Sequence, residues 1–188
     1  MTHSLKLAGA FVLAALLFSS CDKCDPTTTT QMDENDVKWL VYDRGEKVKF
    51  KNEAGDTVVY TNTILRAEQV PGEGFNTGDD CIEHFDVQAY SVIQDPEKDY
   101  PGLMTYFLKK ENSFDVALHV ELAGEYKIDT LQATHATYEI NETTYNNVFE
   151  VVKTDSSKTE NLKRLLFNKE HGFLGVELFN GKKLELLK

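Results

Sequence analysis

The sequence predicts a mainly β protein, an antiparallel meander that forms an open sheet or half-barrel of roughly ten strands. Three observations indicate this class. Short segments in which apolar and polar residues alternate follow one another along most of the chain. Turn residues separate them, most clearly Asn180-Gly181 between two apolar alternations. No segment shows a convincing apolar stripe at helical spacing.

The first expected strand covers residues 46–51, where Val48 and Phe50 alternate with lysines. A glycine turn then leads back into a β-branched strand over 57–65, so the two form a hairpin. The clearest strand covers 114–122. Its apolar residues fall on one face: Phe114, Val116, Leu118, Val120 and Leu122.

The remaining expected strands complete the meander. They cover residues 85–93, 104–109, 126–131, 136–140, 145–153, 162–168, 173–179 and 182–187. Residues 71–80 form a loop without periodicity, and their glycines do not fit a phosphate-binding spacing. Residues 159–167 could form a helix, but the hairpin that follows needs a partner strand, so a strand is favoured.

Composition divides the 188 residues into three parts. Residues 1–20 read as a signal peptide, because the apolar run 7–18 spans only about 18 Å as a helix, too short for a bilayer. Residues 21–36 are polar and rich in Thr and Asp, which predicts a flexible tether. Residues 37–188 are long enough for a single β domain with its own core.

The end of the leader carries a modification signal. Ser19 and Ser20 precede Cys21 directly. This stretch resembles the lipobox of bacterial lipoproteins, in which the cysteine is lipidated and becomes the new N-terminus, although Phe18 departs from the usual aliphatic residue. The resemblance implies attachment to a membrane through acyl chains on Cys21, with ordinary secretion after cleavage near Ser20 as the alternative.

The net charge of −11 bears on partners. An acidic chain is repelled by nucleic acid and by anionic phospholipid, so no nucleic-acid partner is expected. Any membrane attachment must therefore come from the lipid on Cys21.

Lipidation of Cys21 would leave Cys24 and Cys81 as the only cysteines able to pair. A bridge between them would hold the domain close to the membrane and stabilise the fold by about 4 kcal/mol. We expect the two cysteines to remain unbridged, because the tether lacks the apolar residues that would hold it against the domain.

Catalytic and metal-binding residues are hard to find. The serines lack a nucleophile-elbow context, and Cys81 and His84 should point to opposite faces of a strand. The densest set of metal ligands, Asp79, Asp80 and Glu83, lacks the calcium-loop spacing and reads as a solvated acidic loop. The sequence therefore predicts no enzyme, no metal and no cofactor.

Both ends of the domain carry short patterns. Trp39-Leu-Val-Tyr with Gly45-Glu-Lys-Val-Lys-Phe, and Phe167-Asn-Lys-Glu-His-Gly with Asn180-Gly-Lys-Lys, resemble small lipoproteins of Gram-negative gut and oral bacteria. The resemblance implies a cell-envelope location and a β architecture. We expect anchoring in the outer membrane and a non-catalytic binding or accessory role, with an apolar ligand or an envelope protein as partner. The alternative is a carrier of lipid or another apolar ligand in an open half-barrel; a hydrolase is a distant third.

Overall fold

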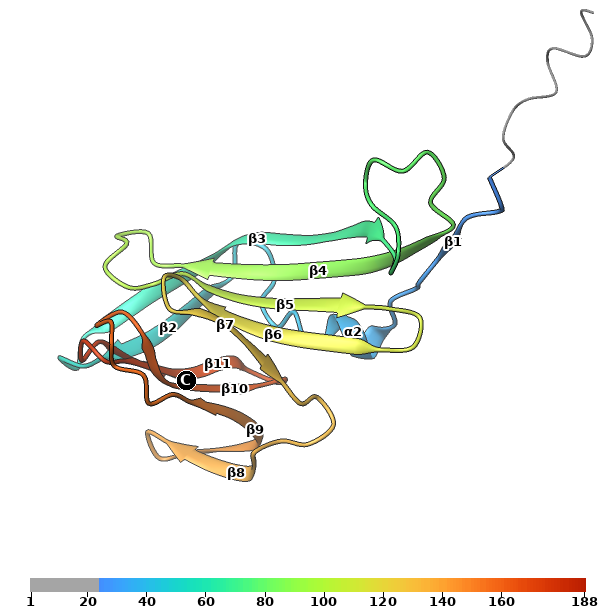
Figure 1. Cartoon of the computed structure of the whole chain (residues 1–188). Helices are drawn as coiled ribbons and strands as arrows, with labels where there is room; N and C mark the ends of the chain where they lie inside the picture. The colour runs from blue at the N-terminus through green and yellow to red at the C-terminus, as the bar shows by residue number, and fades with distance from the viewer. Residues whose placement is uncertain (1–23) are drawn as a thin grey trace, which may run out of the picture.

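The computed structural model describes residues 24–188 (Figure 1). Within these residues lie twelve strands and one short helix, which confirms the mainly β prediction. The strands β2 to β7 are Lys47–Asn52, Thr57–Pro71, His84–Gln94, Leu103–Lys109, Phe114–Val120 and Gly124–Ile128. The strands β8 to β12 are His135–Ile140, Thr143–Val152, Leu162–Asn168, Gly172–Leu178 and Lys183–Leu186. Ahead of them come β1, Thr28–Thr29, and α2, Glu34–Val37.

The strands form two antiparallel meanders that meet in the middle of one sheet. Strands β2 to β7 pair in chain order, and so do β8 to β12. Pairing of β12 with β2 joins the two sets, giving the order β7-β6-β5-β4-β3-β2-β12-β11-β10-β9-β8. The two edges of the sheet are thus β7 and β8, which follow one another in the chain. The sheet curls strongly, and the result is the predicted open half-barrel (Figure 1).

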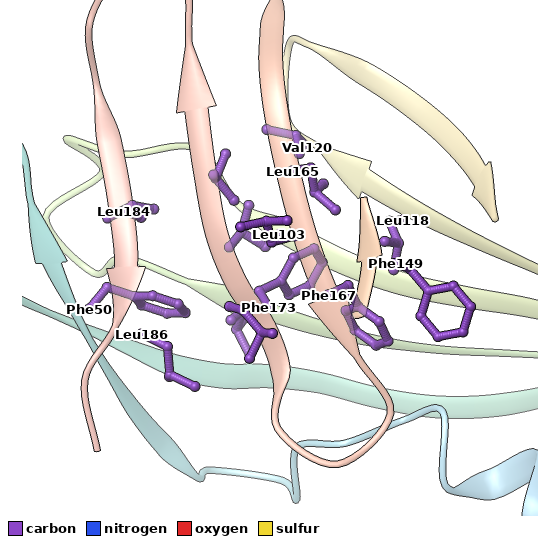
Figure 2. Packing of buried hydrophobic residues seen from close by; sticks show 14 of the residues in the cluster. Phe50, Leu103, Leu118, Val120, Phe149, Leu165, Phe167, Phe173, Leu184 and Leu186 are labelled. Carbon is purple, nitrogen blue, oxygen red and sulfur yellow. The ribbon is translucent and has the colours of Figure 1, made fainter. Parts of the chain in front are cut away.

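Curling brings the inner faces of the two meanders together around the core (Figure 2). Phe50 and Phe107 from one meander and Phe167 and Phe173 from the other have no exposed surface. Trp39 joins them, with its ring 5.4 Å from that of Phe149. The interior of the half-barrel is therefore filled by side chains, mostly aromatic and aliphatic.

The predicted face of β6 is correct except at its end. Val116, Leu118 and Val120 are buried in the core. Leu122 is 82% exposed and has a positive φ of 66°. It lies in the turn after β6, where the chain no longer alternates between faces, so its assignment to the core face was wrong.

The Asn180-Gly181 turn is confirmed as the connection between β11 and β12. Gly181 has a φ of 89°, and the Lys182 backbone N–H donates to Asn180 Oδ1 at 3.0 Å. The segment 159–167 is not helical, because β10 starts at Leu162 and pairs with β9 and β11.

The expectation of a flexible tether over residues 21–36 is wrong for the part that the structure describes. Strand β1 pairs in parallel with the start of β4, matching Thr28 with His84. Asp33 then caps α2 by accepting hydrogen bonds from the backbone N–H groups of Asn35 and Asp36. Hydrogen bonding and capping, which need little apolar surface, order this segment.

Candidate binding sites

The cysteine pair lies where β1 meets β4. Cys24 and Cys81 form a disulfide, with their Cα atoms 5.5 Å apart. Our expectation of two unbridged cysteines was therefore wrong. Pairing of β1 with β4 brings Cys24 beside the end of the 72–83 loop, which the low apolar content of the segment did not reveal. Cys21 lies outside the described residues.

A cluster of polar side chains continues this contact. His84 Nδ1 lies 2.7 Å from Thr28 Oγ1, and its Nε2 lies 3.0 Å from Thr30 Oγ1. The same Nε2 lies 3.2 Å from Asp86 Oδ1, and Asp86 is only 4% exposed. A hydroxyl, an imidazole and a carboxylate in this order resemble a hydrolytic triad.

The arrangement is better explained as a clasp that holds β1 on β4. Thr28 Oγ1 also lies 3.2 Å from the carbonyl oxygen of Glu83. Thr30 Oγ1 lies within hydrogen-bonding distance of His84 Nε2, the nitrogen that would bond only to Asp86 in a triad. The cluster pairs the buried carboxylate of Asp86, which would otherwise be costly. We call Thr28, Thr30, His84 and Asp86 the N-terminal clasp.

The three acidic residues considered as metal ligands do not form a site. Asp79 accepts a hydrogen bond from the Asn76 backbone N–H at 2.6 Å, which closes a turn in the 72–83 loop. Asp80 is exposed beside the disulfide, and Glu83 contacts Thr28 through its backbone carbonyl. Across residues 24–188 no three His, Cys, Asp or Glu side chains are grouped closely enough to hold a metal. None of the helices described there has the length and apolar character to cross a membrane.

A second feature is a cleft on the outer face of β10, β11 and β12. The β8–β9 hairpin bends at Asn147, which has a φ of 51°, and lies across this face. Asn168 Nδ2 donates to the carbonyl of Asn146 at 3.2 Å, and Asn141 Nδ2 at the hairpin tip donates to that of Leu186 at 3.5 Å. The hairpin and the face enclose a cleft of about 210 Å³.

The cleft has an apolar floor and charged walls. Leu166 lies opposite Gly175, where a Cβ atom would come 3.5 Å from Leu166 Cδ1. The lining side chains include both signs of charge and an aromatic ring: Tyr138, Arg164, Glu177, Lys183 and Glu185.

Arg164, one of these lining residues, belongs to a charged cluster that continues beside the cleft. Arg164 Nε donates to Glu150 Oε1 at 2.6 Å, and His135 Nε2 lies 2.7 Å from Glu150 Oε2. Burial opposes ionisation of Glu150, but these hydrogen bonds prevail and lower its pKa. The guanidinium of Arg164 also stacks on Tyr138 at 5.1 Å. The cleft is therefore a preformed polar surface that can exchange hydrogen bonds with a ligand.

The sequence patterns gave no functional role to His135, Arg164 or Glu150. Their meeting depends on the bend of β9, because β8 reaches Arg164 only when the hairpin folds over the sheet. The available sequence signal was Asn147 itself, because Asn is among the residues that most readily adopt the positive φ found at this bend.

A wider hollow of about 600 Å³ lies beside the turn 95–102. Its buried carboxylate is already used: Asp95 accepts hydrogen bonds from the backbone N–H groups of Glu97, Asp99 and Tyr100 at 3.0 to 3.2 Å. These bonds close the turn, so the carboxylate of Asp95 has a structural role in this hollow.

Comparison of the chain with known protein families, curated proteins and solved structures gave no match.

Proposed function

We propose that this protein is a lipoprotein of a Gram-negative cell envelope, anchored in the outer membrane through Cys21, whose domain binds a partner on its outer surface without catalysing a reaction. Three features support this proposal: the apolar leader before Cys21, the Cys24–Cys81 disulfide and the filled interior of the half-barrel.

The disulfide supports the compartment and the anchoring geometry. Disulfides persist in oxidising compartments such as the periplasm and the cell surface. Cys24 follows Cys21 by three residues, which span at most about 10 Å of extended chain. A lipid on Cys21 would therefore hold the 72–83 loop next to the membrane, because Cys81 bonds to Cys24.

The filled core is the single observation that carries surface binding in preference to the carrier alternative. A carrier needs an apolar chamber, whereas aromatic side chains from both meanders occupy the inner face. Polar hydrogen-bonding groups that a partner could use lie outside, in the cleft under the β8–β9 hairpin. We assign binding to this cleft.

Metabolic labelling with a clickable fatty acid tests the anchor. The wild-type protein and a Cys24→Ser variant should both take up label, because only Cys21 is the acceptor. A Cys21→Ala variant should take up none. Label on the Cys21→Ala variant would refute the proposal.

A further inference from the structure

The far half of β3 is a free edge of the sheet. Strand β2 pairs with β3 only from Thr57 to Thr61, and the last backbone contact on that side joins Asn62 to Glu46 at 2.8 Å. From Thr63 to Pro71, β4 is the sole strand that pairs with β3 in the part of the chain that the structure describes (Figure 1). Such an edge can pair with another chain.

The register identifies which backbone groups are free. In an antiparallel pair, alternate residues direct both their N–H and C=O groups toward the partner strand. The Gly72 backbone N–H donates to the carbonyl of His84. The even-numbered residues from Ile64 to Val70 therefore direct their backbone N–H and C=O groups toward β4. Leu65, Ala67 and Gln69 therefore point their backbone groups away from β4. The bulge at Thr63 and the missing N–H of Pro71 limit the free edge to these three residues.

Side chains on the outer face of this edge form a self-complementary row. Ile64, Arg66, Glu68 and Val70 run apolar, cationic, anionic, apolar along one face of β3. The side chains of Arg66 and Glu68 are 61% and 31% exposed and pair with each other at 2.7 Å. Ile64 is 40% exposed, and no residue from Thr63 to Pro71 is fully buried.

We propose that two copies of this protein associate through β3, as antiparallel strands related by a twofold axis at Ala67. This register places Arg66 opposite Glu68 of the partner subunit, and Ile64 opposite the partner's Val70. Opposite charges and paired apolar residues across two strands both favour association. Every one of these contacts occurs twice, as an isologous interface requires.

The same register also satisfies the free backbone groups. Ala67 faces Ala67 of the partner subunit, and Leu65 faces the partner's Gln69, so residues with free N–H and C=O groups meet one another. Ladder bonds at these positions would join the two half-barrels into one continuous sheet. A register shifted by one residue would place the free backbone groups of one copy opposite groups of the other copy that already bond to β4. Ladder bonds therefore form only when residues with free backbone groups face one another.

Cysteine cross-linking of the purified full chain in detergent tests the interface. Hydrogen-bonded antiparallel residues have Cα atoms about 5.5 Å apart, within the range of a disulfide. An Ala67→Cys variant treated with diamide should therefore run as a covalent dimer on a non-reducing gel. Gln69→Cys is the matched control, because Gln69 is also exposed but lies four residues from its own copy in this register. It should stay monomeric.

Charge exchange at the same interface gives a second test. In the Ala67→Cys background, Arg66→Glu opposes two carboxylates at two symmetric positions and should lower the cross-linked fraction about tenfold. Adding Glu68→Arg restores opposite charges and should restore cross-linking. Urea unfolding of the reduced variants shows whether each monomer remains folded.

Cross-linking at the two positions decides whether the β3 interface forms. Cross-linking at Ala67 alone, lost and regained with the charges, supports the interface. Absence of cross-linking at Ala67, or equal cross-linking at Ala67 and Gln69, overturns it. Labelling of Cys21 is a separate readout, so failure of the lipid anchor would not affect this result.

Discussion

At the scale of single residues, the contact between Tyr42 and Gly172 ties the N-terminal segment to the β10–β11 turn. The Phe173 backbone N–H donates to Tyr42 Oη at 2.8 Å, and Tyr42 Oη donates to the carbonyl of His171 at 3.3 Å. Burial raises the pKa of the Tyr42 phenol, so its proton stays available for the second bond. Gly172 has a φ of 77°, and a Cβ atom there would overlap the Tyr42 ring and hydroxyl.

A Gly172→Ala substitution should lower the free energy of unfolding by about 2 to 5 kcal/mol, the sum of left-handed backbone strain and overpacking. Urea unfolding followed by circular dichroism measures the change. Gly45→Ala is the matched control, because Gly45 has a φ of 79° with open space around it. It should cost only about 1 to 2 kcal/mol. Equal losses in the two variants would contradict a role for the Tyr42 contact.

At the scale of elements, the segment from Cys24 to α2 is held by a disulfide and by several weaker contacts that act together. The disulfide fixes its start, and the N-terminal clasp holds β1. The buried carboxylate of Asp36 in α2 lies 3.2 Å from Lys109 Nζ in β5. Each of these contacts lowers the entropy cost of forming the next.

Replacing both Cys24 and Cys81 with Ser should lower the free energy of unfolding by up to about 4 kcal/mol, because the disulfide closes a loop of 57 residues. Native-state hydrogen exchange should show faster exchange at the amides of Thr28 and Thr30, which bond to Glu83 and Phe85. Amides in β10 and β11 serve as the internal control and should keep their protection. Unchanged exchange at Thr28 and Thr30 would show that the clasp holds without the disulfide.

At the scale of the whole molecule, the curled sheet uses its inner face for its own core. Tyr60, Leu103, Leu118 and Leu174 are fully buried alongside the phenylalanines. Ligand exchange at this face would require the two meanders to separate, which would expose much of the apolar surface that stabilises the fold. We therefore expect partners to bind outside the half-barrel.

Native mass spectrometry of the protein purified from the cells that produce it tests this expectation. The native mass per chain should equal the denatured mass, which includes any covalent acyl chains, because no further lipid is held. A stoichiometric lipid lost on denaturation would favour the carrier alternative. The denatured sample is the control that separates covalent lipid from bound lipid.

Local patterns in the sequence determined most of the strands. Alternation in β2 and β6 and the Asn180-Gly181 turn depend on neighbours a few residues apart, so they can be recognised without the fold. The net charge and the mainly β class are likewise properties of composition or of short segments.

Only the tertiary structure decided which distant segments meet. Pairing of β12 with β2 and the bend of β9 over the outer face set the core and the cleft. The contact of β1 with β4 allows the Cys24–Cys81 disulfide, which the sequence did not favour. Such contacts depend on how the whole sheet curls and on hydrogen bonds between remote backbone groups. The polar residues that make these contacts show no periodic pattern in the sequence, because their partners lie more than fifty positions away.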